Sequence, residues 1–444
     1  MKNLFSEFNN ISKNEWSEKI IQDLKGKPEE LLTITDEIEE ISYSSFYHKE
    51  DSIERNKPGN LPYIRGIKKS SNEWRNCHYE LINKEKKNNA RCLKALMSGS
   101  DMLWFQVNRK DVDWNTVLED IQTEYISVVL ETDDVENIKI LTKSGKKNIT
   151  YAFDAYKNGF DALMELYSAF KDYQFPFLLV DASKIQQAGG NISQQIGFAL
   201  NVGHEYLLHL VNKGFSVDEA SACIQFKFGV GNDYLKESLK FRTFRGLWSN
   251  VIAAYIPEHK CSHHTIIHAF ITHLNKSLKD PYTNLLRQTT EVMSAVNGNI
   301  DSICVLPYNH YSYDGSSELA ERMALNITNI LKEESYFDKV CDPLGGSYSL
   351  ENLQEKISDR AWGNFQEIEA NGGLMQTSAR ENFYNQINIV RSKRVTNFSN
   401  GKQTLIGVNK FENRDEINNS WIDIPNYDGL LSLILENELQ NSNK

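Results

Sequence analysis

The densest cluster of metal-ligating side chains in the sequence is Cys261, His263, His264 and His268. Cysteine sulfur and histidine nitrogen are ligands that zinc prefers, and on a helix His264 and His268 would share one face. However, the stretch Thr265–Thr272 is rich in β-branched and aromatic residues, and a strand there would break that geometry. No further ligand with suitable spacing is evident. We therefore expect histidines in a loop and a strand, and no metal site.

Two glycine pairs have types and spacing that could hold phosphate. Gly229 and Gly231 follow a predicted strand and precede a predicted helix, but the third glycine of a dinucleotide-binding fingerprint is missing. Gly345 and Gly346 lack the Lys-Ser/Thr pair that follows the glycines of a P-loop. The serine elbow of α/β-hydrolases and the H-E-x-x-H motif of zinc proteases are also absent from the sequence. We expect both glycine pairs to serve in turns.

The elements that must position any site alternate between short apolar runs and helix-period segments. Eight runs are predicted as strands: Tyr63–Ile67, Leu103–Val107, Ile126–Glu131, Ile149–Phe153, Phe177–Asp181, Ile224–Phe228, Thr265–Thr272 and Ser302–Leu306. Helical patterns lie between most of them: Val112–Ile121, Gly159–Phe170, Ile192–Asn212, Leu235–Tyr255 and Leu285–Val296. This alternation predicts an α/β fold, a (β/α)8 TIM barrel, with a doubly wound open sheet as the alternative.

The two ends of the chain differ from this central part. Residues 1–60 contain a helical stretch that begins at Ser12, followed by a polar, acidic passage from Glu37 to Asn60. Such an arm cannot bury itself, so we expect it to lie along its own barrel or along a partner chain. Residues 61–340 would form the barrel and 341–444 a helical extension and tail. Four elements are predicted there: helices Leu350–Ala370, Ser378–Val390 and Leu430–Leu439, and a strand at Gln403–Val408.

The composition excludes several classes of protein. Asp and Glu number 60 against 49 Lys and Arg, a net charge of −11, which argues against nucleic-acid binding. No apolar run approaches the roughly 18 residues of a membrane span, and the start of the sequence lacks the apolar region of a signal peptide. The six cysteines are scattered singly. We expect a cytoplasmic protein with free thiols, and neither a membrane nor a nucleic acid as partner.

Longer strings of sequence resemble one enzyme family. Eight strings follow its order: EWSEKIIQDLKGK (15–27), LPYIRG (61–66), IQQAGGN (185–191), FKFGVG (226–231), LKFRTFRGLW (239–248), DPYTNLLRQTTEVMSAVNGNIDS (280–302), CDPLGGSYSLENL (341–353) and AWGNFQEIEANGGLM (361–375). Together they are similar to the barrel domain of the methylmalonyl-CoA mutases. The resemblance extends from about Phe5 to Asn409.

The resemblance implies a cofactor, but the sequence lacks the motif with which the family binds it. The family interconverts methylmalonyl-CoA and succinyl-CoA with adenosylcobalamin, whose cobalt is ligated by the histidine of an Asp-x-His-x-x-Gly motif in a separate C-terminal domain. None of the ten histidines here follows an aspartate by two residues, and 444 − 409 = 35 residues remain after Asn409. We therefore expect no cofactor on this chain, and adenosylcobalamin on a partner subunit.

The resemblance also places altered residues at four positions that catalytic members use. Lys184 takes the place of the histidine that bonds the thioester carbonyl, and Lys68 that of the tyrosine that presses on the cofactor. Cys223 takes the place of the arginine that clamps the substrate carboxylate, and Phe270 replaces the glutamine of a His-Cys-Gln triplet that begins at His268. A cysteine cannot give a carboxylate the bidentate pairing of a guanidinium. We expect this chain to have no catalytic residues.

The strand sequences favour the same conclusion. A barrel that admits a pantetheine chain needs small inward-facing residues, whereas Leu103–Val107 and Ile224–Phe228 place bulky side chains at alternate positions, which predicts a filled interior. Our first hypothesis is the small, non-catalytic subunit of a heterodimeric mutase whose partner is the large catalytic subunit, with the N-terminal arm in the interface. One alternative is the catalytic barrel of a split mutase whose cobalamin domain is a separate chain. Another is a regulatory, acyl-CoA-sensing barrel.

Overall fold

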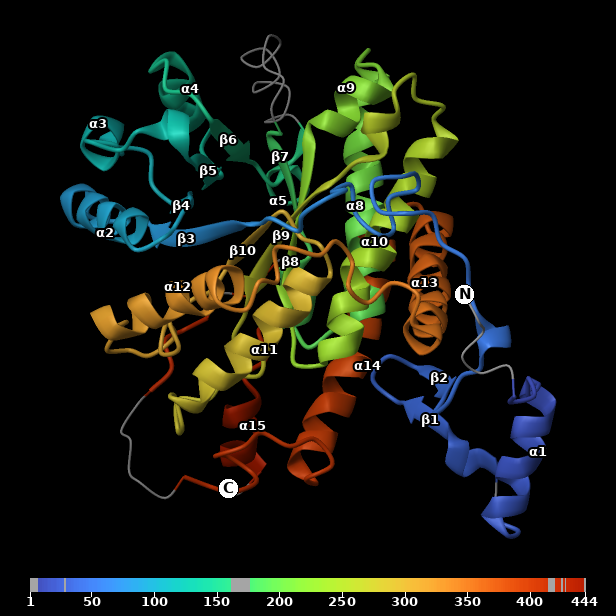
Figure 1. Ribbon diagram of the computed structural model, residues 1–444. Coiled ribbons are helices and arrows are strands. Elements are labelled where there is room, and N and C mark those ends of the chain that lie inside the picture. Colours follow the sequence, from blue (N-terminus) through green and yellow to red (C-terminus); the bar gives the residue numbers. More distant parts are fainter. Residues whose placement is uncertain are drawn as a thin grey trace.

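The computed structural model describes residues 7–27, 29–160, 176–413, 420–424, 426–427 and 429–442. Its centre is a sheet of eight parallel strands in the order β6-β5-β4-β3-β10-β9-β8-β7 (Figure 1). The strands are β3 (Arg75–Leu81), β4 (Met102–Val107), β5 (Ser127–Thr132), β6 (Ile149–Ala152), β7 (Leu178–Asp181), β8 (Ile224–Val230), β9 (Ile266–Ile271) and β10 (Ser302–Cys304).

The two end strands of this order meet and close the ring. Phe153, next to β6, forms a parallel bridge with Leu178 of β7. The amide of Phe153 donates to the carbonyl of Phe177 at 3.0 Å, and the amide of Leu179 donates to the carbonyl of Phe153 at 2.9 Å. The predicted (β/α)8 barrel is therefore confirmed, and an open doubly wound sheet is excluded.

Helices follow the strands and form the outer layer. They are α2 (Glu85–Met97), α3 (Trp114–Val117), α4 (Val135–Lys143), α5 (Ala155–Asn158), α7 (Ser183–Gln187), α8 (Ile192–Asn212), α9 (Val217–Ala222), α10 (Tyr234–Ala254), α11 (Thr283–Asn297) and α12 (Glu318–Glu333). The predicted helix Val112–Ile121 is shortened to α3, and most of the predicted helix Gly159–Phe170 lies outside the described residues. None of the described helices combines the length and the apolar composition that crossing a bilayer requires.

The strands alternate between two apolar environments, as period-2 side chains must. Leu103 and Phe105 of β4, and Phe226 and Phe228 of β8, belong to the large core between the sheet and the helices. A second, separate core inside the barrel contains Trp104 and its neighbours. The prediction of a filled interior is confirmed, but it named these outward-facing residues as the filling, because the sequence pattern does not show which alternate set points inward.

The first barrel strand was predicted at the wrong place. Tyr63–Ile67 forms turns, with Tyr63 at φ 60° and Gly66 at φ 83°, and the first barrel strand is β3. Arg245 of α10 holds the turn by donating to the carbonyls of Tyr63 at 3.1 Å and Ile64 at 3.3 Å. The true strand, Arg75–Leu81, has the sequence RNCHYEL and too few apolar residues to be recognised by hydrophobic alternation.

The N-terminal arm contains the helix that the sequence predicts from Ser12 and a hairpin that the sequence analysis missed. Helix α1 (Lys13–Leu24) begins at a capping box made by Ser12 and Glu15 and buries no residue. Strands β1 (Thr33–Asp36) and β2 (Ile41–Ser44) pair antiparallel, and Figure 1 shows α1 and this hairpin projecting beside α14, away from the barrel strands.

Four acidic side chains of the hairpin dock it onto the barrel helices, and we call them the hairpin latch: Asp36, Glu37, Glu39 and Glu40. Asp36 pairs with Lys236, Glu37 with Lys402, and Glu40 with Arg360 and Lys393. The carboxylate of Glu39 accepts the amides of Ile192 at 3.0 Å and Ser193 at 3.4 Å, at the first turn of α8. Of the two supports expected for the arm, its own barrel therefore holds the hairpin.

The C-terminal part adds helices α13 (Tyr348–Ala370), α14 (Thr377–Ser399) and α15 (Leu435–Ser442). Helix α13 packs on α8 and α10, and the three lie side by side (Figure 1). The predicted strand Gln403–Val408 is wrong, because these residues form turns with one isolated bridge between Ile406 and Lys410.

Candidate functional site

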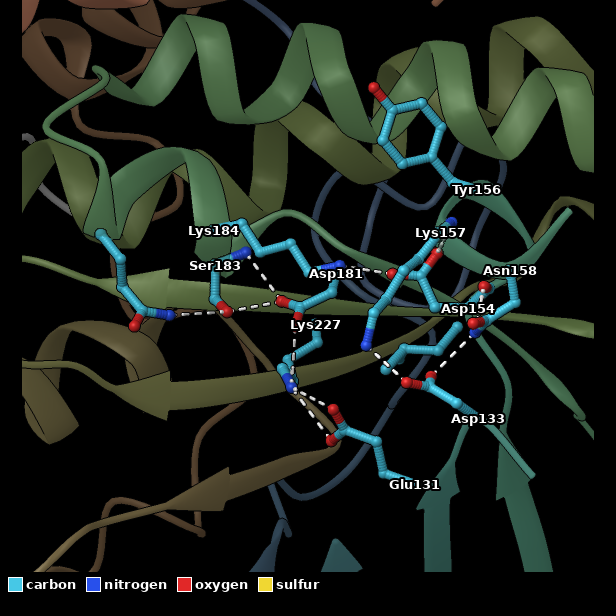
Figure 2. Close-up of polar contacts among 12 residues, drawn as sticks. Glu131, Asp133, Asp154, Tyr156, Lys157, Asn158, Asp181, Ser183, Lys184 and Lys227 are labelled. Carbon is cyan, nitrogen blue, oxygen red and sulfur yellow. Dashed lines mark hydrogen bonds and ion pairs between the residues drawn. The ribbon is translucent and has the colours of Figure 1, made fainter. Parts of the chain in front are cut away.

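Charged side chains gather at the carboxyl ends of four neighbouring strands, the end at which TIM barrels place their active sites. We call Glu131, Asp154, Asp181, Lys184 and Lys227 the mouth cluster. Glu131 lies on β5, Asp154 follows β6, Asp181 ends β7, Lys184 lies in α7 and Lys227 on β8. Figure 2 shows these side chains converging on one another.

Lys227 is the centre of the cluster. Its Nζ lies 2.9 Å from Oδ2 of Asp181 and 3.1 Å from Oε2 of Glu131 (Figure 2). The indole N–H of Trp104 donates to the same Glu131 oxygen at 2.6 Å, and the hydroxyl of Ser183 donates to Asp181. The donors of one lysine are thus shared between two carboxylates, which side chains from β4 and α7 hold in place.

Lys184 forms the second half of the cluster. Its Nζ pairs with Oδ2 of Asp154, whose other oxygen accepts the hydroxyl of Tyr206 at 3.0 Å. Asp154 also caps α5 by accepting the amide of Lys157 at 3.2 Å. Both lysines of the cluster are therefore committed to carboxylates of this same chain.

The pKa shifts of Lys227, Lys184 and Asp181 favour their charged forms. Burial by itself would lower the pKa of Lys227 and of Lys184, but the charges of Asp181, Glu131 and Asp154 outweigh it and raise both. Burial would raise the pKa of Asp181, but the charges of Lys227 and Lys184 outweigh it and lower that pKa. A lysine held protonated is neither a base nor a nucleophile, and a carboxylate held ionised is not a proton donor.

Below the cluster, the interior of the barrel is filled. Trp104 is fully buried and packs against Phe270 and His268, with ring centroids 5.0 Å away in each case. His268 donates or accepts at both ring nitrogens, 2.9 Å from Oε1 of Gln225 and 2.7 Å from the hydroxyl of Ser302. Burial lowers the pKa of His268 to about 4, so it is neutral and serves as a bridge between strands.

The four positions that the resemblance predicted to be altered, Lys184, Phe270, Cys223 and Lys68, do not meet in one place. Lys184 lies at the mouth and Phe270 inside the barrel. Cys223 comes immediately before β8, at the amino end of that strand, and Lys68 donates to the carbonyl of Ile300, two residues before β10. A seven-residue strand is about 20 Å long, so side chains at its opposite ends do not contact the same reacting group.

The candidate metal ligands are also separated. His263 bonds Ser249 at 2.9 Å, whereas His268 lies inside the barrel and Cys261 is exposed. Among the described residues, one different group, Asp218, Glu258 and His259, brings three ligand atoms within 4.8 Å of one another. Asp218 there accepts the amides of both neighbours at 3.0 Å and the hydroxyl of Ser262, which explains the arrangement without an ion.

Three of the four paired glycines lie where a side chain would collide with neighbouring atoms, whereas Gly346 has open space around it and φ 87°. A Cβ on Gly229 would lie 3.0 Å from Gln186 and from Thr272, and one on Gly231 would lie 2.8 Å from Glu237. A Cβ on Gly345 would lie 2.3 Å from the guanidinium of Arg65. These close approaches are to the chain's own side chains, as expected for glycines in packed turns.

Sequence reasoning missed most of the mouth cluster, although a signal was present. The predicted strands Ile126–Glu131 and Phe177–Asp181 each end in an acidic residue, and carboxyl ends of parallel strands meet at one face of a barrel. It also passed over His273, which follows β9 at the mouth, and considered only His268 on that strand. Burial and the charge of Lys276 lower the pKa of His273 to about 3, so it is neutral.

Comparisons with known proteins agree with the resemblance. The family described as "Methylmalonyl-CoA mutase" matches residues 151–430. The methylmalonyl-CoA mutase small subunit of Porphyromonas gingivalis is 31% identical over 93% of this chain and 72% of its own length. The small subunit of Propionibacterium freudenreichii subsp. shermanii is 29% identical over 52% of this chain and 36% of its own.

Two further matches cover less. The methylmalonyl-CoA mutase of Rhizobium meliloti is 30% identical over 56% of this chain and 35% of its own length, so this chain spans about a third of that relative. A solved dihydropteroate synthase from Thermus thermophilus aligns with a TM-score of 0.33 and 12% identity over 58% of this chain and 94% of its own, a likeness too low to bear on function. The family match covers residues 151–430, and the Porphyromonas gingivalis relative aligns with 93% of this chain, so the chain belongs to the methylmalonyl-CoA mutase family.

Proposed function

We propose that this chain is the small, non-catalytic subunit of an adenosylcobalamin-dependent methylmalonyl-CoA mutase, and that it forms a heterodimer with the large catalytic subunit. Two relatives named as small subunits support the assignment, one of them along nearly the whole chain. The reaction, the interconversion of methylmalonyl-CoA and succinyl-CoA, belongs to the partner.

The observation that carries this proposal is that the charges of the mouth cluster are paired with one another. Both lysines that could polarise a thioester carbonyl or hold a carboxylate are paired within the chain, Lys227 with Asp181 and Lys184 with Asp154. A substrate would have to break a buried ion pair and leave a carboxylate uncompensated, which costs about 3–5 kcal/mol. Trp104 and Phe270 fill the axis that an acyl-CoA would need to enter.

The residues at the mouth do not fit cobalamin. The ring of Tyr427, from the C-terminal tail, lies over Lys184 with its centroid 5.6 Å from Nζ. His273, the histidine that follows β9 there, is fully buried and faces the ring of Tyr311 at 5.2 Å. A flat cofactor would have to displace the chain's own side chains from this face, so this chain takes no part in the chemistry of cobalamin.

The N-terminal arm supplies a surface for the partner. Five apolar side chains on it are exposed by 44–68%: Phe8, Ile11, Ile21, Leu31 and Ile34. Exposed apolar side chains concentrated in one part of a chain are typical of protein interfaces. The latch holds the hairpin, and α1 is fixed to the following segment by Lys13–Asp51 and by the packing of Trp16 on Phe46 at 4.9 Å. We therefore propose that the arm is preformed for docking.

Co-expression with the large mutase subunit of the same organism tests the proposal. The two chains should co-elute at one-to-one and interconvert methylmalonyl-CoA and succinyl-CoA with adenosylcobalamin, while this chain alone should not. Replacing two exposed residues of the arm, in the variant Ile11→Asp/Leu31→Asp, should weaken the association of the two chains. The control is Tyr125→Asp, at an exposed site outside the arm.

Turnover by this chain without a large subunit, after addition of a stand-alone cobalamin-domain chain, would contradict the proposal. It would establish the alternative, the catalytic barrel of a split acyl-CoA mutase. If the two chains co-elute but the pair has no activity, the assignment to a mutase is also contradicted.

A further inference from the structure

The C-terminal tail crosses the mouth of the barrel, the face where a TIM barrel would take a ligand. We call its described residues before α15 the strap: 420–424, 426–427 and 429–434. The strap contacts the loops that follow β10, β7 and β9 in turn, and each contact uses backbone groups as well as side chains.

The first attachment is to the loop after β10. Trp421 forms an antiparallel bridge with Ser312. The amide of Tyr313 donates to the carbonyl of Ser420, and the amide of Ile422 donates to the carbonyl of Tyr311, both at 2.9 Å. The indole of Trp421 stacks on the ring of Tyr311, with centroids 6.1 Å apart.

The second attachment lies over the mouth cluster itself. Tyr427 and Leu430 exchange backbone hydrogen bonds of 2.9 and 2.7 Å across a turn in which Gly429 has φ 89°, a conformation that favours glycine. This turn aims the ring of Tyr427 at Lys184. Burial raises the pKa of Tyr427, and the nearby charge of Asp181 raises it further, as expected for a phenol lying among the cluster.

The third attachment runs along the end of α7. The amide of Leu433 donates to the carbonyl of Gln187 at 2.8 Å, and the side chain of Leu433 is fully buried. Arg391 of α14 donates to the carbonyls of Leu431 and Ser432 and also to that of Ala188 at 3.3 Å, which ties the strap to the helix end beneath it.

The strap is anchored beyond the mouth at the start of α15. The carboxylate of Glu436 accepts the amides of Leu278 at 2.7 Å and Lys279 at 2.9 Å, in the loop after β9. Leu433 and Leu435 complete a small separate core with Leu274 and Phe398. The strap is thus fixed on both sides of the opening.

We propose that the strap is an intramolecular stopper of the barrel mouth: the chain's own tail occupies the place where related barrels accept a ligand. It keeps water and solutes away from the mouth cluster, whose ion pairs it covers with Tyr427. This inference rests on the proposed function in one respect: it takes the mouth of the barrel to bind no substrate. The inference concerns the access of solvent to the mouth and not turnover, so it and the proposed function can be contradicted by separate experiments.

Hydrogen exchange of the full chain, followed by mass spectrometry, tests the stopper with a matched pair of variants. Leu433 is fully buried, whereas Leu431, two residues earlier on the same strap, is 58% exposed. Leu433→Asp should speed exchange of amides in segments 182–190 and 272–279 by about tenfold or more, through release of the strap. Leu431→Asp should leave them unchanged, and β4 and α8 should stay protected in both.

Two results would overturn the proposal. If Leu433→Asp leaves the mouth segments as protected as Leu431→Asp does, the strap does not close the mouth. If protection falls equally in β4 and α8, the strap is part of the folding core and not a stopper. Should Leu433→Asp fail to fold, Glu436→Gln removes one charge of the anchor and should speed exchange at the amides of 278–279 and of 433 only.

Discussion

The mouth cluster and the hairpin latch use the same kinds of side chain in opposite ways. In the mouth cluster, Lys227 and Asp181 lie on neighbouring strands of one sheet and are buried. In the latch, Glu37 and Lys402 are more than half exposed and join segments 365 residues apart. Buried, rigidly placed ion pairs cost much to break, whereas exposed ones contribute little and are screened by salt. The mouth is therefore fixed, whereas the exposed pairs of the latch, unlike the largely buried pair Asp36–Lys236, are contacts that salt can weaken.

The largest expected effect is on the mouth. Lys227→Met would leave Asp181 and Glu131 without their shared cation, so we expect the free energy of unfolding to fall by about 3–5 kcal/mol. Lys157→Met is the control, because Lys157 and its partner Asp133 are about half exposed and we expect a loss below about 1 kcal/mol. Urea denaturation of the three proteins measures both; similar losses for the two variants would abolish the contrast between buried and exposed pairs.

An intermediate effect is expected from Glu39, the one buried carboxylate of the latch. Burial raises its pKa from 4.5 to about 7. At pH values between these two, the folded protein keeps a proton on Glu39 that the unfolded chain releases. The contribution of Glu39 to the free energy of unfolding is therefore greatest below about pH 4.5 and is lost as the pH rises through about 7. The shift corresponds to about 3 kcal/mol at most.

The variant Glu39→Gln isolates this contribution, because its side chain is neutral at every pH. We expect the stability of the variant relative to the natural protein to rise between about pH 4.5 and about pH 7, by an amount on the order of 3 kcal/mol at most. Thermal denaturation at a series of pH values measures it. A difference between the two proteins that stays constant with pH would show that Glu39 has an ordinary pKa.

The smallest effect is expected from salt. Raising NaCl from about 0.15 to about 1 M shortens the screening length from about 8 to about 3 Å, which should weaken Glu37–Lys402 and the pairs of Glu40 by under about 1 kcal/mol. Hydrogen exchange should therefore quicken in residues 33–44 and not in 178–184. Equal quickening in both segments would mean that the mouth is as open to ions as the arm.

The sequence predicted the periodic elements well. Seven of the eight barrel strands were located, and helix Ile192–Asn212 was predicted with both of its bounds, because apolar residues recur there at helical spacing. The first strand was missed because its sequence, RNCHYEL, is polar. The hairpin β1–β2 was missed because only Ile41 and Tyr43 of its strands pack against the core, and much of its attachment comes from charges.

The site was harder to predict, for a geometric reason. Alternation along Ile224–Phe228 shows that two sets of side chains face opposite ways, but not that Gln225 and Lys227 face inward. The resemblance gave Lys184 a place at the mouth, yet it also grouped Cys223 and Lys68 with it, and these lie at the amino ends of the strands. The strap could not be predicted, since its backbone hydrogen bonds to the barrel loops join residues more than 100 positions apart.

The most direct measurement of the central claim is the turnover number of the reconstituted pair with Lys184→Gln in this chain, with co-elution and thermal denaturation to verify that the pair is intact. If this chain is non-catalytic, kcat should equal that of the natural pair within about twofold, because the lysine pairs with Asp154 of its own chain and lies over the ring of Tyr427. A loss of about a hundredfold or more, in a pair that still co-elutes, is the effect of removing a group that acts on the reacting atoms. That result would contradict the account and place a catalytic site in this barrel.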